Sequence, residues 1–278
     1  MNQVTDQQII EILRKEAVPA LGCTEPVACA LACAKCKEVL GGVPERLDVL
    51  VSGNIYKNGM GVGIPGTGMV GLPIAAALGA VCGKSEYGLE VLKEVNVGDN
   101  LQRAKDMLGQ VTVSLKEDAP DKLYAEALAT KGNDRVKVII AHTHTNIVLV
   151  EKNGDEIFKR EFRLDTSKPE DKGPELSVKR IWDFVHEVDV KDIEFVLQGA
   201  EMNKAISAEG LNSEYGLQIG KTLKENIDKG LLEDDLLNRT LIRATAASDA
   251  RMDGCPKPVM TNSGSGNQGI TVYLPVVV

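Results

Sequence analysis

A thiol, a hydroxyl and a carboxylate stand in consecutive positions at Cys23, Thr24 and Glu25, between two segments with helical patterns. The start of a helix favours anions and lowers the pKa of a nearby thiol, because the backbone N–H groups there are unpaired. A thiolate at Cys23 could move a proton in general acid–base chemistry. Capping of the helix by Thr24 or a neighbour is the simpler alternative.

Two further polar clusters could bind a small ligand. Residues 52–59 (SGNIYKNG) supply amides and an amine just after an expected strand, although a solvated turn has the same composition. Residues 261–269 (TNSGSGNQG) combine hydroxyls, amides and flexible backbone N–H groups, which suits a carboxylate or a phosphate. A flexible linker is the alternative for this second cluster.

Three cysteines, Cys29, Cys33 and Cys36, match the CxxxCxxC spacing by which radical enzymes hold an iron–sulfur cluster. Such ligands need a loop that can wrap around the cluster, whereas these three fall within an expected helix and share one of its sides. Packing of small buried thiols is the favoured interpretation. A radical enzyme stays as a competing hypothesis, to be tested by replacing all three with Ala.

Gly61, Gly63 and Gly66 form a literal GxGxxG, with Glu86 twenty residues beyond the last glycine. A dinucleotide site needs a strand directly before the glycines and a second strand ending at the acid. Neither is expected here, so the glycines are better explained by a close approach of the backbone to a small ligand, or by unusual dihedral angles in a tight loop.

The three histidines give weak signals. His142 and His144 stand two apart at an expected strand end, so both should face the same side of it. Two histidines alone make a poor metal site, because a stable one needs three or four ligands. His186 follows Trp182 by four residues on a helical pattern and is expected to be structural.

The elements that must position these residues are readable from the hydrophobic periodicity. A first helix should start at the Thr5/Gln8 capping box and stop before Pro19, and a second should occupy 26–40. The segment 52–68 looks too rich in glycine for regular structure. Further helices are expected at 69–82, 86–95 and 99–108, and strands at 47–51, 111–115, 123–130, 136–141, 146–151 and 156–162, with an Asn153-Gly154 hairpin turn.

After these grouped strands the pattern turns helical, in about four segments from 177 to 247. The order predicts an α+β fold in which grouped strands pack with helices and a helical region follows. Residues 163–175 are polar and contain two prolines, so we place a boundary there. The predicted parts are an α+β domain with the Gly-rich loop at 1–165 and a mostly helical part at 166–278.

Composition limits the classes of partner. With 32 basic and 40 acidic residues the formal net charge is −8, and no basic block is present. Nucleic acid and anionic membrane are therefore not expected as partners, because both are held by clustered positive charge. No apolar run is long enough to span a bilayer, and the N-terminus lacks a signal-peptide pattern. We expect a cytoplasmic protein with six reduced cysteines.

Five segments of the sequence, taken together, are specific enough to indicate a family. They are PALGCTEP (19–26), SGNIYKNGMGVGIPGTGMVGLPIAAALG (52–79), HTNIV (144–148), ATAASDARM (244–252) and MTNSGSGNQGIT (260–271). In this order they resemble the L-cysteine desulfidase family, long catalogued as uncharacterised and related to the alpha chain of the iron–sulfur L-serine dehydratases. The resemblance extends from about residue 6 to the end of the chain.

The resemblance implies an α,β-elimination without pyridoxal phosphate, in which L-cysteine gives sulfide, pyruvate and ammonia. In the family a [4Fe–4S] cluster with one iron free of protein thiolate acts as a Lewis acid. Carried over to this sequence, Cys23 is the candidate for proton transfer. The candidates for binding the amino-acid substrate are Thr24, Glu25, Asn54, Lys57, Asn58, Thr67, His144, Asn146, Arg251, Ser263, Ser265, Asn267 and Gln268.

Members of the family continue beyond the point where this chain stops, and their cluster ligands lie in that later region. None of the six cysteines here takes a ligand's place, so we expect the ligands outside this chain and no cluster bound by it. We therefore expect a truncated product or a natural remnant that is inactive alone. The alternative is a non-catalytic module that binds a small amino acid or serves as a scaffold. The sequence leaves open whether cysteine or serine is the substrate and whether the chain forms a homo-oligomer.

Overall fold

The computed structural model describes residues 4–160 and 176–278. Its first part is a six-stranded sheet in the order β5-β2-β6-β7-β8-β9, in which only the β2–β5 pair is parallel. The strands are β2 (Arg46–Val51), β5 (Val111–Leu115), β6 (Tyr124–Lys131), β7 (Asp134–Ala141), β8 (Ile147–Lys152) and β9 (Asp155–Lys159). The expected α+β fold, with grouped strands and a helical region after them, is confirmed.

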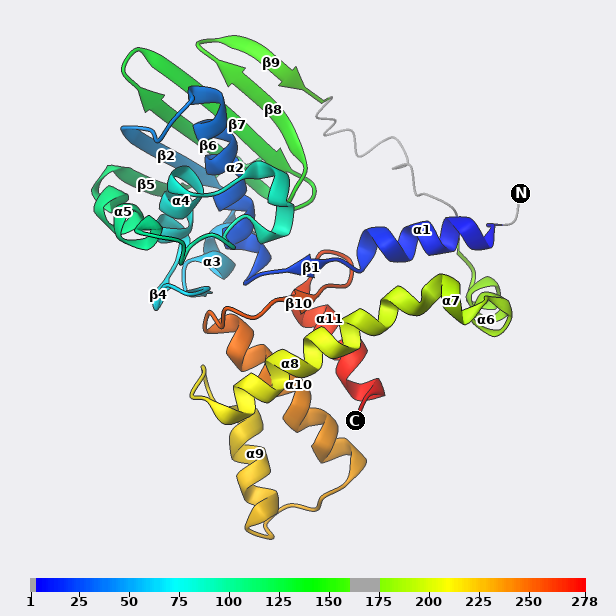
Figure 1. The fold of residues 1–278 in the computed structure, drawn as a ribbon. Helices are drawn as coiled ribbons and strands as arrows, with labels where there is room; N and C mark the ends of the chain where they lie inside the picture. The colour runs from blue at the N-terminus through cyan, green and yellow to red at the C-terminus, as the bar shows by residue number, and fades with distance from the viewer. Residues whose placement is uncertain (1–3, 161–175) are drawn as a thin grey trace.

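Two apolar helices, α2 (Thr24–Leu40) and α4 (Leu72–Val81), pack on one side of the sheet (Figure 1). They approach so closely that a Cβ on Gly79 would lie 2.1 Å from the carbonyl oxygen of Ala30. The opposite side of the sheet carries ion pairs such as Lys137 to Glu151 at 2.8 Å. A sheet with one side in the core and one in solvent has this alternation.

The cysteines of α2 belong to that core. Cys29, Cys33 and Cys36 have no exposed surface, and the Cys36 thiol donates to the carbonyl of Ala127 at 3.5 Å. The packing interpretation of these three thiols is confirmed, because they lie within a regular helix between α4 and the sheet.

The Gly-rich segment is more regular than the sequence suggests. Residues 53–59 form α3 (Gly53–Gly59), and β3 (Gly63–Ile64) pairs with β4 (Met69–Val70), so the expectation of an irregular 52–68 is wrong. Burial of Ile55 at 1% exposure anchors the short helix despite its glycines. The next helix, expected from 69, consequently begins only at Leu72, with Pro73 in its first turn.

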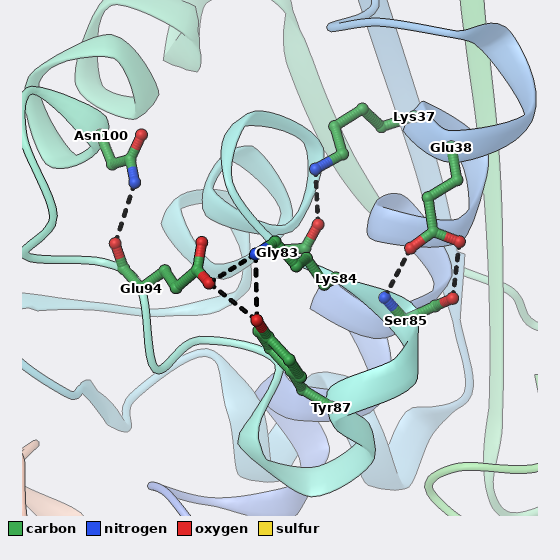
Figure 2. A network of polar contacts seen from close by, with 8 residues as sticks. All are labelled: Lys37, Glu38, Gly83, Lys84, Ser85, Tyr87, Glu94 and Asn100. Atoms are coloured by element: carbon green, nitrogen blue, oxygen red, sulfur yellow. Dashed lines mark hydrogen bonds and ion pairs between the residues drawn. The ribbon is translucent and has the colours of Figure 1, made fainter.

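The segment after α4 is held by a polar network (Figure 2). Lys37 of α2 donates to the carbonyl of Gly83, and the carboxylate of Glu38 accepts from the backbone and hydroxyl of Ser85 at 2.6 Å each. Lys84 and Tyr87 both donate to Glu94. The expectation of a helix at 86–95 is wrong, because these residues form the 3₁₀ segment η1 (Ser85–Glu90), which is broken at Gly88 and followed by turns. Helix α5 (Asn100–Met107) comes next and leads into the 3₁₀ turn η2 (Leu108–Gln110).

The C-terminal part is helical, as expected, with five α-helices and one 3₁₀ turn between 177 and 252, where we predicted about four segments. Its elements are α6 (Val178–Glu187), α7 (Val190–Ile193), η3 (Glu194–Val196), α8 (Leu197–Asn212), α9 (Ile219–Asp228), α10 (Leu236–Met252), β10 (Val259–Met260), α11 (Gly266–Tyr273) and η4 (Leu274–Val276). A Cβ on Gly210 would lie 2.0 Å from the carbonyl oxygen of Ala246, so α8 and α10 are in close contact.

Residues 4–20 run along this C-terminal part (Figure 1). Helix α1 (Asp6–Glu16) starts at the expected capping box, and its Ile9 and Ile10 pack with Phe184 of α6. Strand β1 (Pro19–Ala20) then pairs with β10. The proposed boundary at 163–175 lies outside the described residues, and the division at 165 stays a prediction.

The GxGxxG segment also joins the two parts. A Cβ on Gly63 would lie 2.3 Å from the backbone carbonyl carbon of Asp253, and the backbone N–H of Gly66 donates to the carbonyl of Gly254. Gly63 therefore allows two backbones to approach, although the partner is protein and not the small ligand that was expected. Gly66 takes a positive φ of 73°, in keeping with the alternative of unusual dihedral angles, and a Cβ on Gly61 would meet no heavy atom within 4 Å. No helix within residues 4–160 and 176–278 is long and apolar enough to cross a membrane.

Candidate active site

A pocket of about 320 Å³ lies where the N-terminus of α2 meets α3, the turn after β7 and the C-terminal end of α10. Nine of the predicted site residues line it: Cys23, Thr24, Glu25, Asn58, His144, Arg251, Ser263, Ser265 and Asn267. Side chains from residue 23 to residue 267 thus converge at one place, and both parts of the molecule contribute.

The centre of the pocket wall is a thiol–carboxylate pair. Cys23 is the N-cap of α2, and its thiol donates to Oε2 of Glu25 at 2.8 Å. The amide of Asn58 donates to the other carboxylate oxygen at 3.1 Å, and the hydroxyl of Thr24 reaches Oε2 at 3.4 Å. Glu25 is therefore held as an acceptor by donors on two sides.

The expected thiolate at Cys23 is contradicted by its surroundings. The pKa of the thiol is raised from 9.0 to about 11: burial raises it most, the Arg251 charge lowers it, and the charge and side-chain hydrogen bond of Glu25 raise it. The helix N-terminus is present as expected, but Cys23 is only 6% exposed and faces a carboxylate. The thiol is accordingly protonated near neutral pH.

Glu25 and His144 complete the charge pattern on this side. Burial alone would raise the pKa of Glu25, but the hydrogen bonds from Cys23 and Asn58 and the nearby His144 lower it below its usual value of 4.5. Burial lowers the pKa of His144 below 6.5, aided by Arg251 and opposed by Glu25. Near neutral pH the pocket therefore holds an ionised Glu25 and a neutral His144.

Arg251 supplies the positive charge. It lies in the last turn of α10 and is only 3% exposed, and burial lowers its pKa. One terminal nitrogen donates to Oδ1 of Asn267 at 3.0 Å and approaches the sulfur of Met252 at 3.6 Å. The buried Nε has no hydrogen-bond partner among the described residues. A guanidinium that retains a free donor beside a pocket is suited to a carboxylate.

Two helix N-termini reinforce this preference for an anion. Helix α2 begins at the pocket with Cys23 as N-cap, and α11 begins there with Ser265, whose hydroxyl accepts from the backbone N–H of Gln268. Unpaired N–H groups at both helix starts favour negative charge in the space between them.

Five predicted binding residues lie outside the pocket lining. Asn54 and Lys57 are exposed on α3, and Gln268 is exposed on α11. Thr67 is buried and donates to the carbonyl of Ile64 at 2.7 Å, and Asn146 donates to the carbonyl of Ala141 at 3.0 Å, so both stabilise their own turns. Their roles in binding stay predictions. The pocket adds Met252 and Gly264, which stand beside predicted residues in the segments 244–252 and 260–271.

The two neighbouring histidines do not face the same side. Strand β7 ends at Ala141, and His142 has a φ of 71°, which turns the chain out of the extended conformation. Nδ1 of His142 lies 2.6 Å from Asp121, whereas His144 lines the pocket. The prediction that both histidines face one side is wrong, because side chains alternate only within a strand and both residues follow the last residue of β7. Nδ1 of His186 donates to the carbonyl oxygen of Trp182 at 2.8 Å, and the two rings are in contact, in keeping with a structural role.

A [4Fe–4S] cluster does not fit the residues of this pocket. Across the described ranges, no group of three or more His, Cys, Asp or Glu side chains could hold a metal ion. Cys23 is the one thiol lining the pocket, while the three cysteines of α2 are closed into the core.

Comparison with known proteins places the chain in a family. The serine dehydratase alpha chain family matches residues 86–278, which include His144, Arg251 and the 263–267 loop. This chain belongs to that family. The match to this family begins at residue 86 and so does not include Cys23 and Glu25. The alignments to individual relatives are longer and do include these two residues.

Three relatives carry the name UPF0597 protein. Those of Actinobacillus pleuropneumoniae serotype 3 and Dichelobacter nodosus are each 49% identical, over 98% and 99% of this chain and 63% and 64% of their own lengths. That of Parabacteroides distasonis is 46% identical over 100% of this chain and 65% of its own. This member of the serine dehydratase alpha chain family thus spans slightly less than two thirds of these relatives. No solved structure matches the chain.

Proposed function

We propose that this chain forms the substrate-binding part of a serine dehydratase-like lyase that performs α,β-elimination on L-cysteine or L-serine. One observation carries the proposal: a buried guanidinium with a free donor faces the same small pocket as a hydrogen-bonded thiol–carboxylate pair. The first group can bind the α-carboxylate of an amino acid, and the pair can move its α-proton.

Binding follows from the charges in the pocket. The α-carboxylate is placed at Arg251 and the start of α11, where the guanidinium and backbone N–H groups all favour an anion. A volume of about 320 Å³ admits a small amino acid and limits larger side chains.

Proton transfer follows from the Cys23–Glu25 pair. Glu25 can accept the thiol proton along the existing 2.8 Å hydrogen bond, and the resulting thiolate, stabilised by the Arg251 charge, can remove the α-proton. The bond from Cβ to sulfur or oxygen then breaks, and the leaving group takes the proton that Glu25 holds, which leaves Glu25 ionised and Cys23 protonated by the former α-proton. The remaining aminoacrylate tautomerises to an imine, which water converts to pyruvate and ammonia.

The family relation implies a [4Fe–4S] cluster, which as a Lewis acid would help the leaving group depart. The described residues do not fit such a group, so we propose that its ligands come from outside this chain and derive no step through it. On this basis we expect the chain alone to bind an amino acid without turning it over.

Calorimetric titration of the purified chain with L-serine and L-cysteine tests the binding function. We expect saturable binding that Arg251→Gln weakens at least tenfold, because it removes the charge that pairs with the carboxylate. Arg243→Gln is the matched control, since Arg243 lies two turns earlier on α10 and is exposed. Equal affinity of the two variants would overturn the carboxylate assignment.

Pyruvate release tests the catalytic part. The chain, reconstituted anaerobically with iron and sulfide, should release no pyruvate from L-cysteine; release would overturn the expectation of inactivity. A form carrying the additional length of the relatives should release it. Binding without turnover in that longer form would favour the non-catalytic alternative.

A further inference from the structure

The first residue of α11 lies directly against the guanidinium of Arg251. A Cβ built on Gly266 would be 2.4 Å from Nε and 2.6 Å from Cζ of that arginine. Both distances are far below any real carbon contact, so only a hydrogen atom fits at this position. The guanidinium occupies the space that a side chain would otherwise fill.

Few other contacts fix the guanidinium. Among the described residues, Asn267 accepts one hydrogen bond, Met252 provides a weak sulfur acceptor, and Nε has no partner. The sulfur of Cys23 is a further acceptor, and the charge of Glu25 also acts on the guanidinium. Its position therefore depends strongly on the shape of the space around it, of which Gly266 forms one wall.

We propose that Gly266 is a positioning residue, which sets where the guanidinium of Arg251 lies relative to the substrate carboxylate and to Cys23. The part that concerns the carboxylate rests on the proposed function; the part that concerns Cys23 does not.

The atoms that a Cβ on Gly266 would meet differ in kind from those at two other tightly packed glycines. A Cβ on Gly269 would lie 2.0 Å from the backbone oxygen of Met260, and one on Gly63 would meet the backbone of Asp253. In both cases the added methyl would clash with backbone atoms, so no side-chain rotation could remove the clash. At Gly266 the obstructed atoms are the far end of a flexible side chain, so an added methyl should move Arg251 and leave the backbone in place.

Movement of Arg251 has a consequence at the thiol. The Arg251 charge lowers the pKa of Cys23, against the larger effect of burial. Displacing that charge should raise the pKa of the thiol further, and a thiol reacts only as thiolate. Alkylation of Cys23 thus reports the position of Arg251 without any substrate.

The experiment compares Gly266→Ala with Gly61→Ala, since a Cβ on Gly61 has no heavy atom within 4 Å. Circular dichroism checks folding at each pH, and mass spectrometry follows alkylation of Cys23 by iodoacetamide from pH 8 to pH 12. We expect Gly266→Ala to move the midpoint upward and to slow alkylation at pH 9 by about threefold, and to weaken L-serine binding about tenfold. Gly61→Ala should change neither.

A double-mutant cycle with Arg251→Gln separates positioning from general disturbance. In the Arg251→Gln background, Gly266→Ala should not move the alkylation midpoint, because the displaced charge is already absent. If Gly266→Ala alone fails to fold, the shorter glutamine side chain in the double variant should restore folding; failure to restore it would overturn the proposal.

A folded Gly266→Ala variant with the wild-type alkylation midpoint would also overturn the proposal. If the wild-type chain binds neither amino acid, the proposed function fails, yet the alkylation series still decides the role of Gly266.

Discussion

The thiol of Cys23 donates to the carboxylate of Glu25 across 2.8 Å, and Asn58 donates to the opposite oxygen of the same carboxylate. The hydrogen bond stabilises the protonated thiol and the ionised acid together. The proton therefore lies on the sulfur of Cys23, and the carboxylate of Glu25 lies beside it as an acceptor. Proton transfer requires this arrangement.

Replacing Glu25 by Gln should make Cys23 more acidic. The Glu25 side chain raises the pKa of the thiol through its charge and its hydrogen bond, so its removal leaves burial opposed by the Arg251 charge and by the backbone hydrogen bond at residue 25. We expect the alkylation midpoint of Cys23 to fall below that of the wild type by about one pH unit. Asn54→Ala, on the exposed side of α3, is the control and should leave the midpoint in place. An unchanged midpoint in Glu25→Gln would contradict the pairing.

Stability should fall between pH 9 and pH 11 in a way that depends on Cys23. The pKa of the Cys23 thiol is about 11 in the folded protein, compared with its usual value of 9.0. The contribution of the protonated thiol to the free energy of unfolding is therefore fully present below pH 9 and is lost as the pH rises through 11. The difference corresponds to about 3 kcal/mol. Urea unfolding at pH 8 and pH 11 should show a smaller loss for Cys23→Ser than for the wild type. The same loss in both would exclude Cys23 as its source.

His144 should titrate below 6.5. Burial is the main cause of its lowered pKa, and Glu25 opposes the change. A depressed histidine pKa gives a contribution to stability that is present above pH 6.5 and is lost as the pH falls below it. NMR titration of the imidazole protons, assigned with a His144→Gln variant, measures the midpoint. In Glu25→Gln the midpoint should fall further, and a rise there would contradict the assigned charges.

Gly79→Ala should destabilise the fold although Ala is the better helix former. The added methyl would lie 2.1 Å from the backbone oxygen of Ala30, so α2 and α4 would have to separate. We expect a loss of about 1 to 3 kcal/mol in urea unfolding, typical of an overpacked core. Gly109→Ala is the control, because a Cβ there has no heavy atom within 4 Å. A loss of the same size in both variants would contradict the close contact of the two helices.

Local patterns in the sequence predicted most of the fold. The capping box of α1, the Gly41 end of α2 and the Asn153-Gly154 turn with its two positive φ angles are formed by residues near one another in the chain. Alternation likewise placed the strands, because one side of the sheet is core and the other is solvent. The Gly-rich segment was misjudged because one buried side chain, Ile55, outweighs the weak local propensity around it.

The residue types of the site were also readable from the sequence, but its chemistry depended on tertiary structure. Cys23 at a helix start predicts a thiolate; burial and the adjacent Glu25 reverse that prediction, since desolvation and a like charge outweigh the helix terminus. The sequence by itself determined most of the secondary elements, the family resemblance and most of the pocket residues. Only the tertiary structure brought Arg251 and residue 266 to Cys23, because β1–β10 pairing and close glycine contacts join segments that are far apart in the chain.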